Sequence, residues 1–216
     1  MNDWTPVRRS TGRSVDSDDE PLVGYRIMVL GMSWGGLAAA RRILPALPAD
    51  FAIPVALVQH RHRDSDALLA RFLQELTSLR VCEVEDKQPI EPGRVFIAPA
   101  NYHMLVEDGY FSLSTEGPVR FSRPSIDVSF MSAAATYGHR VVGVVLTGAN
   151  EDGAVVLRRI ADGGGMTVVQ DPASAEVEAM LTRALRAVPT ARVFPLQRMG
   201  EFLAGLPSAF AAPSGT

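Results

Sequence analysis

The sequence predicts an α/β domain with a doubly wound, mainly parallel sheet, helices on both faces and an inserted antiparallel hairpin. From residue 25 onward, short β-branched apolar runs alternate with stretches of helical periodicity, which is typical of stacked βαβ units. Polar or glycine-rich turns follow several of these runs. The 216 residues are 47% hydrophobic and 21% charged, which is enough for one large buried core.

The first half of this region contains two strand, turn and helix units. A strand over 26–30 is broken by glycines at 31, 35 and 36, and helical spacing follows over 37–47. A second strand over 55–58 ends at Gln59 and His60. Residues 64–66, Asp-Ser-Asp, offer caps for the next helix, whose apolar face covers 68–76.

Further strands are expected over 81–84 and 95–97, and a hairpin interrupts the parallel order. Its strands, 104–106 and 110–113, flank Asp108-Gly109, which is a strong hairpin signal. A helix starts at Ser125, the expected cap, with Asp127 at the positive end of its dipole, and runs to residues 137–138.

The remaining elements continue the alternation. The most apolar strand covers 141–146, and a polar exit loop follows over 147–153. The later elements are a helix to 161, a strand over 166–169, a helix over 175–187, a strand over 192–194 and a last helix to 206. We therefore expect one domain over 25–206, between a flexible polar tail over 1–24 and a loose C-terminal tail over 207–216.

The composition argues against several classes of protein, including nucleic-acid-binding, secreted and membrane-embedded proteins. The net charge of -3 supplies no diffuse positive field, so nucleic acid is not an expected partner. Cys82 is the single cysteine, which excludes an internal disulfide and fits a reducing cytoplasm. The first twenty residues lack an apolar signal region, and no run approaches the ~18 apolar residues that span a bilayer. We expect a cytoplasmic protein without direct membrane insertion.

The turn after the first strand carries the strongest chemical signal. Residues 31–35, Gly-Met-Ser-Trp-Gly, fit G-x-S-x-G directly after a strand and before a helix, where a sharp turn exposes the hydroxyl of Ser33. The helix N-terminus points its free N–H groups at the same place, where an oxyanion could be held. A glycine turn with a capping serine, or a phosphate-binding loop, would share this pattern.

Ser33, His60 and Asp152 each follow the carboxyl end of a predicted strand, the edge where open α/β sheets place their ligands. These residue types match a nucleophile, a base and an acid. Glu151 and Asp127 compete with Asp152 for the acid role. The chain order Ser, His, Asp differs from that of ordinary α/β-hydrolases.

Metal and cofactor chemistry are not expected. His60, His62, His103 and Cys82 could in principle form a zinc site, but neither C-x-x-C nor H-x-x-x-H spacing is present. His139, at a strand start on the opposite edge, is expected to be structural.

Five motifs together resemble the catalytic domain of CheB, the chemoreceptor protein-glutamate methylesterase, over residues 26–206. They are 31–36 (GMSWGG), 58–60 (VQH), 97–104 (IAPA with HM), 123–128 (RPSIDV) and 146–154 (LTGANEDGA). The resemblance implies a modified doubly wound domain that hydrolyses glutamate γ-methyl esters on chemoreceptors or related signalling proteins, releases methanol and often deamidates glutamines. It implies Ser33 as nucleophile, His60 as base and Asp152 as orienting acid.

The sequence departs from the family pattern around the expected pocket. Trp34 replaces the usual Thr, Arg61-His62 replaces Met-Pro, and Ala149-Asn150 replaces Met-Gly. The later Gly-Met-Pro segment is represented by 179–181, which contains Met180. The residues before the first strand are too few for a receiver domain of ~100 residues, so we expect a stand-alone catalytic domain not regulated by an attached receiver.

Other residues are expected around the serine. The candidates for the substrate contacts and the oxyanion hole are Trp34, Gly35, Ala149, Asn150, Arg123, Asp127 and Met180. Arg61, Arg63 and Arg123 could form a positive rim that aids encounter with an acidic receptor, although ordinary solvated arginines would look the same. Two other functions fit the pattern, a receptor-binding scaffold without activity and a serine esterase for small molecules.

Overall fold

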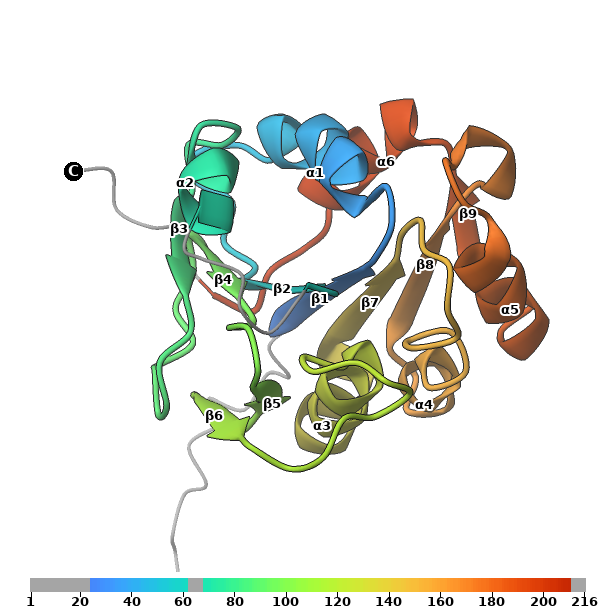
Figure 1. Ribbon diagram of the computed structural model, residues 1–216. Helices are drawn as coiled ribbons and strands as arrows, with labels where there is room; N and C mark the ends of the chain where they lie inside the picture. Colours follow the sequence, from blue (N-terminus) through green and yellow to red (C-terminus); the bar gives the residue numbers. More distant parts are fainter. Residues whose placement is uncertain (1–23, 62–67, 211–216) are drawn as a thin grey trace, which may run out of the picture.

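Seven parallel strands form the central sheet of the computed structural model, which describes residues 24–61 and 68–210 (Figure 1). The strand order is β3-β4-β2-β1-β7-β8-β9, and every neighbouring pair is parallel. The strands are β1 Ile27–Met32, β2 Val55–Gln59, β3 Arg80–Glu83, β4 Arg94–Ile97, β7 Val141–Val145, β8 Met166–Gln170 and β9 Arg192–Phe194. The predicted parallel sheet is confirmed.

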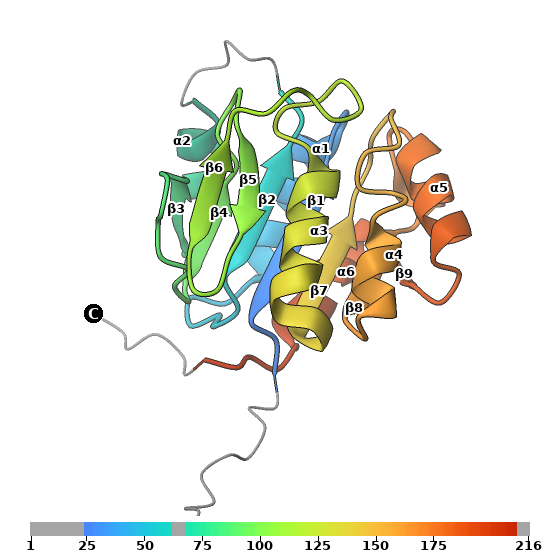
Figure 2. The same cartoon turned by 90° about the horizontal axis from the view of Figure 1, so that it is seen from below.

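Helices cover both faces of this sheet, as predicted. One core lies under α1 Gly36–Ile43, α2 Leu68–Gln74 and α6 Leu196–Ala204, and the other lies under α3 Ile126–Tyr137, α4 Leu157–Asp162 and α5 Ala179–Ala187 (Figures 1 and 2). Strands β1, β2 and β7 are buried because both of their faces are covered, which explains their continuous apolar runs.

The predicted hairpin lies outside the main sheet. Strands β5 His103–Val106 and β6 Phe111–Ser114 pair antiparallel in a sheet of their own. Met104, Val106 and Phe111 bury their side chains in the same core as α3. The hairpin therefore covers part of one face of the main sheet beside α3 (Figure 2).

The chain reverses its direction of winding at β1. It proceeds from β1 to β2 on one side and returns later to β7 on the other side. At such a switch point the loops at the carboxyl ends of neighbouring strands diverge and leave a crevice. The loops after β1, β2 and β7 therefore meet at one edge.

The helix predicted over 175–187 begins later, at Ala179. Residues 172–174 form a short 3-10 turn, and Val177 hydrogen-bonds to the loop after β7 through both its N–H and its carbonyl group. The carbonyl of Val177 is thus used by Gly148 and Thr147 and not by an intrahelical N–H, and the helix begins after it.

Both predicted tails fall largely outside the described residues, as do the expected helix caps at 64–66. The first part of the expected C-terminal tail is not loose, because the N–H of Tyr25 donates to the carbonyl of Pro207 and the N–H of Ala209 donates to that of Tyr25. Within residues 24–61 and 68–210, no helix is long and apolar enough to cross a membrane.

Candidate active site

Ser33, His60 and Asp152 come together at the carboxyl edge of the sheet. Ser33 follows β1, His60 follows β2, and Asp152 lies in the loop after β7. Because β2, β1 and β7 are neighbours, their exit loops lie side by side. The sequence-based grouping of these three side chains therefore agrees with the geometry.

The imidazole of His60 bridges the other two side chains. Its Nδ1 lies 3.1 Å from Ser33 Oγ, and its Nε2 lies 2.6 Å from Asp152 Oδ2. A carboxylate accepts only, so Nε2 carries the proton toward Asp152 and Nδ1 offers its lone pair to the serine hydroxyl. This arrangement allows the imidazole to take the proton of Ser33 while the buried carboxylate stabilises the resulting charge.

The side chain of Gln59 fixes the backbone around Ser33 and His60. Its Nε2 donates to the carbonyl oxygens of Ser33 and His60, at 3.0 Å and 2.9 Å. The N–H of His60 donates to the carbonyl of Met32 at 3.1 Å. The loops after β1 and β2 are thereby held together, which positions the imidazole beside the hydroxyl.

Asp152 is buried at the N-terminus of α3, where its carboxylate accepts four hydrogen bonds. Oδ2 accepts from His60 Nε2 and from the N–H of Ile126 at 2.6 Å, while Oδ1 accepts from Ser125 Oγ at 2.8 Å and from the N–H of Asp127 at 2.9 Å. Burial by itself raises the pKa of Asp152, but these hydrogen bonds and the charge of His60 outweigh it, so its pKa lies below the ordinary value. The carboxylate is therefore ionised at neutral pH.

The two competing acids occupy other positions. Asp127 accepts from Arg120 Nε at 2.7 Å and from the N–H of Gly153 at 2.7 Å. Burial raises the pKa of Asp127, and Arg120 opposes that rise. Glu151 is paired with Arg120 and Arg183. Neither carboxylate has a contact with His60 in the described part of the chain.

Two glycines shape the turn that carries Ser33. Gly35 adopts φ 79°, a left-handed conformation that disfavours residues with a Cβ. At Gly36 a Cβ would lie 2.6 Å from Gln59 Oε1 and 2.8 Å from Met32 Cβ. The turn can therefore pack closely against the β2 exit loop and expose the serine hydroxyl.

The backbone N–H groups of Trp34 and Gly35 have no acceptor among the described residues. They precede the first residue of α1, where free donors and the helix dipole favour negative charge. Trp34 is 67% exposed, and its indole Nε1 donates to Glu176 Oε1 at 2.9 Å. The exposed side chain of Trp34, the residue after Ser33, is thus held at the surface by the segment before α5.

The loop after β7 forms another side of the site. A Cβ at Gly148 would lie 3.0 Å from Ser33 Cβ and 2.5 Å from Met180 Cε. Met180 is buried in the core, so it supports this loop and does not line the opening. Asn150 Nδ2 lies 3.3 Å from His60 Nδ1, and Ala149 is exposed.

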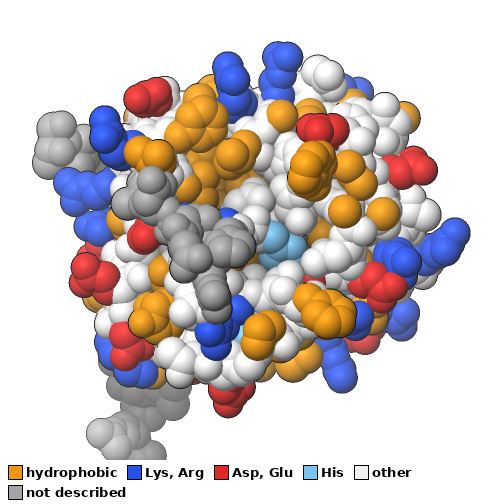
Figure 3. All heavy atoms as spheres, in the orientation of Figure 1, with side chains coloured by type: hydrophobic (Ala, Val, Ile, Leu, Met, Phe, Trp, Pro, Cys, Tyr) orange, Lys and Arg blue, Asp and Glu red, His pale blue; other side chains and the backbone are white. Residues whose placement is uncertain are grey.

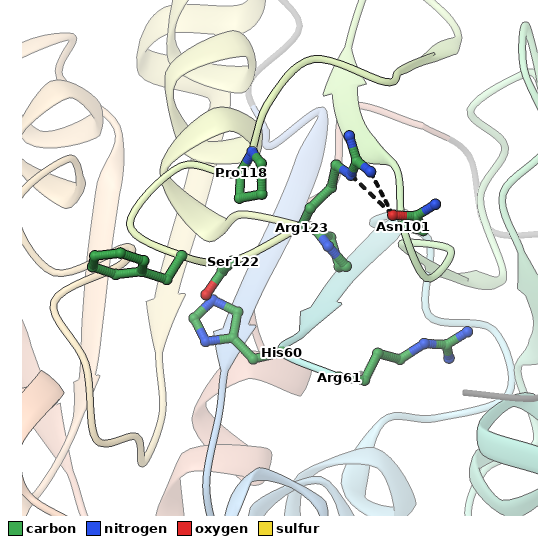
Figure 4. Close-up of a pocket in the computed structure, with 8 residues that line it drawn as sticks. His60, Arg61, Asn101, Pro118, Ser122 and Arg123 are labelled. Carbon is green, nitrogen blue, oxygen red and sulfur yellow. Dashed lines mark hydrogen bonds between the residues drawn. The ribbon is translucent and has the colours of Figure 1, made fainter. Parts of the chain in front are cut away.

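A cavity of about 510 Å³ opens beside His60. Its lining consists of His60, Arg61, Asn101, Pro118, Phe121, Ser122, Arg123 and Pro124. Figure 4 shows the ring of His60 facing Ser122 across this space. The cavity therefore reaches the site at His60, whose Nδ1 lies 3.1 Å from Ser33 Oγ.

The two described arginines of the expected positive rim, Arg61 and Arg123, line the cavity beside His60, but each is held by acceptors of the protein. Arg61 is largely buried, points away from His60 and pairs with Glu83 (Figure 4). Arg123 donates to Asn101 and to the carbonyl oxygens of Thr115 and Glu116. Both guanidinium groups connect segments of the fold, because nearby acceptors compete successfully with solvent. Arg63 and His62 lie outside the described residues.

His103, which the sequence left open as a metal ligand, is buried and fully used by the fold. Its Nε2 lies 3.1 Å from the carbonyl of Gly117, and its Nδ1 accepts from the N–H of Ser125 at 3.2 Å. In residues 24–61 and 68–210, no group of three or more His, Cys, Asp or Glu side chains is arranged to hold a metal ion. His139 lies in the short 3-10 helix before β7.

Sequence reasoning missed three residues that organise the site. Ser125 was expected only as a helix cap, but its hydroxyl also donates to Asp152. Gln59 holds the Ser33 and His60 carbonyls, and Thr147 Oγ1 donates to the carbonyl of Trp34 at 3.1 Å. All three lie within motifs that carry the family resemblance, 58–60, 123–128 and 146–154, but those motifs by themselves assign them no role at the site.

The chain matches the family model described as CheB methylesterase over residues 28–203. A Leptospira interrogans protein with a provisional name, protein-glutamate methylesterase/protein-glutamine glutaminase, is 44% identical over 180 residues, 83% of this chain and 93% of that protein. Protein-glutamate methylesterase/protein-glutamine glutaminase 2 of Anaeromyxobacter dehalogenans is 40% identical over 199 residues, 91% of this chain and 58% of that protein.

The fold comparison agrees with the sequence comparison. The crystal structure of the Thermotoga maritima CheB methylesterase catalytic domain superposes with a TM-score of 0.80 at 30% identity, and the match covers 84% of this chain and 98% of that one. The described residues thus correspond to that catalytic domain. This chain belongs to the CheB methylesterase family.

Proposed function

We propose that this protein is a serine hydrolase that removes methyl groups from glutamate γ-methyl esters on a bacterial chemoreceptor or a related signalling protein. The observation that carries the proposal is the chain of contacts from Ser33 Oγ through His60 to Asp152. Membership of the CheB methylesterase family, whose curated relatives are named for this activity, supports the same reaction.

In the first half of the reaction, Ser33 Oγ attacks the ester carbonyl carbon and its proton passes to His60 Nδ1. Asp152 keeps the imidazole in the required tautomer and stabilises its positive charge. The bond between the carbonyl carbon and the methoxy oxygen then breaks, and His60 returns the proton to that oxygen. Methanol leaves, and a glutamyl ester remains on Ser33.

A water molecule completes the cycle. His60 takes a proton from the water as its oxygen attacks the acyl carbon, and the Ser33 oxygen leaves with that proton. The product is a glutamic acid side chain, which releases its remaining proton to the solvent and becomes a carboxylate. A glutamine side chain can follow the same route with ammonia as the leaving group, which would account for the glutaminase activity in the relatives' names.

The negative oxygen of the tetrahedral intermediate needs hydrogen-bond donors. The N–H groups of Trp34 and Gly35 are our first candidates, because they adjoin Ser33 and have no acceptor among the described residues. The loop at Ala149 and Asn150 is the second candidate. Donors of this kind stabilise the transition state by about 3–4 kcal/mol.

The test is methanol release from a methylated chemoreceptor fragment by the wild type and by Ser33→Ala. We expect release by the wild type and none above background by the variant. Labelling of Ser33 by a fluorophosphonate without methanol release would indicate an esterase for other substrates. The absence of both would indicate a binding protein and would overturn the proposal.

A further inference from the structure

A strained two-residue turn stands at the rim of the cavity beside His60. Val119 and Ser122 exchange backbone hydrogen bonds of 3.1 Å and 2.9 Å, and the residues between them, Arg120 and Phe121, have φ 48° and 64°. Turns with two positive φ values are dominated by Gly, Asn and Asp, because a Cβ is crowded in this conformation. Arg and Phe at the tip are therefore unusual.

The side chain of Arg120 anchors the turn to neighbouring segments. Its guanidinium donates to Asp127 at 2.7 Å and to Glu151 at 3.3 Å. On the other side, Asn150 Nδ2 donates to Ser122 Oγ at 3.4 Å. The turn is thus fixed to the loop after β7 and to the start of α3, both of which carry parts of the candidate active site.

Phe121 has no comparable structural role. Its side chain is fully exposed, so its ring adds no buried apolar surface to the fold. The residue nevertheless lines the same cavity as His60 and keeps a left-handed backbone. Strained residues that do not help the fold are found mainly at functional sites.

The surroundings of the turn fit contact with a protein. Trp34, Leu37 and Tyr102 are also exposed apolar side chains in segments at this edge of the sheet. Figure 3 shows a histidine side chain exposed near the centre of this face, with several separate hydrophobic side chains around it. Because His60 lines this cavity and contacts Ser33, a substrate bound at Ser33 has its flanking polypeptide close to this rim.

We propose that the 119–122 turn is a docking element for the protein substrate, and that Phe121 packs against an apolar side chain of the segment that carries the esterified glutamate. This inference rests on the proposed function and adds a specificity-determining residue to it. An aromatic ring suits the role, because it supplies a large contact area with only two rotatable bonds.

The experiment compares kcat/KM for a methylated chemoreceptor fragment with kcat/KM for a small methyl ester in four proteins: the wild type, Phe121→Ala, Phe121→Tyr and Val193→Ala. We expect Phe121→Ala to lose about ten-fold more on the receptor fragment than on the small ester, which is typical of an aromatic hot spot. Phe121→Tyr should keep the wild-type ratio of kcat/KM for the receptor fragment to kcat/KM for the small ester. Val193, an exposed apolar residue on the edge strand β9, is the matched control and should leave both constants unchanged.

A second variant separates docking from folding. Phe121→Gly removes the ring and relieves the left-handed strain, so its melting temperature should equal or exceed that of the wild type while its ratio falls like that of Phe121→Ala. Equal losses on both substrates, or no loss on either, would overturn the inference. The proposed function would fail separately, by absence of methanol release from the receptor fragment in the wild type.

Discussion

Asp127 and Asp152 are interlocked through the N-terminus of α3. The N–H of Asp127 donates to Asp152 Oδ1 at 2.9 Å, and Asp127 Oδ1 accepts from the N–H of Gly153, the residue after Asp152, at 2.7 Å. Burial raises the pKa of Asp127, whereas the hydrogen bonds to Asp152 outweigh its burial and lower its pKa. Of the two neighbouring acids, Asp152 therefore carries the more stable charge, and it is the one that contacts His60.

Asp152→Asn should damage both activity and stability. Each carboxylate oxygen accepts two hydrogen bonds, so the amide nitrogen of Asn must face two donors in either orientation. We expect kcat to fall by about 10³–10⁴-fold and the free energy of unfolding to fall by about 1–3 kcal/mol. Steady-state kinetics and urea unfolding measure the two effects. If Asp152→Asn were silent and Glu151→Gln or Asp127→Asn impaired kcat instead, the acid assignment would be wrong.

Ser33→Ala and His60→Ala should remove activity, and Ser33→Ala should do so with little loss of stability. Each variant removes a reacting group, so we expect kcat for a small ester to fall by about 10³-fold or more. Within the described part of the chain, the Ser33 hydroxyl has one side-chain hydrogen bond, to His60, so Ser33→Ala should unfold within about 1 kcal/mol of the wild type. Methanol release and urea unfolding are the measurements. Normal turnover by Ser33→Ala would refute the mechanism.

The pH dependence of stability should report the ionisation of Asp152. Because the pKa of Asp152 is lower in the folded protein than in the unfolded chain, the ionised carboxylate stabilises the fold. This contribution is fully present above the unfolded value of about 3.9 and is lost as the pH falls through the lower folded value. The difference in unfolding free energy between the wild type and Asp152→Asn should therefore shrink below about pH 4. Urea unfolding at several pH values tests this, and a difference that grows on acidification would contradict it.

Asn150→Gly should make Ser33 more reactive. Asn150 Nδ2 lies 3.3 Å from His60 Nδ1, the atom that must accept the serine proton, so the amide competes for the same lone pair. Loss of one such hydrogen bond corresponds to about a two- to ten-fold increase in the rate of acylation. The rate of inactivation by a fluorophosphonate measures this step alone. A slower inactivation would contradict this prediction and would show that Asn150 assists the reaction, either at the imidazole or as an oxyanion donor.

The sequence by itself determined the parallel sheet and the edge at which chemistry occurs. Continuous β-branched runs require burial on both faces, and helical periodicity between them requires crossover connections, so parallel strands follow. Ser33, His60 and Asp152 come directly or shortly after three such runs. Because parallel strands end at one edge, their proximity follows from local patterns alone.

Only the tertiary structure decided which partner each polar side chain takes. Asp152, and not Glu151 beside it, faces His60 because the N-terminus of α3 supplies two N–H donors to its carboxylate. Arg61 and Arg123 are bound by distant acceptors, Glu83 and Asn101, that no local pattern links to them. The turn at Arg120 and Phe121 lacks the glycine that marks such turns, because ion pairs from Arg120 to Asp127 and to the distant Glu151 hold it in place. Contacts between residues far apart in the chain depend on packing, and packing is not encoded in any short stretch of sequence.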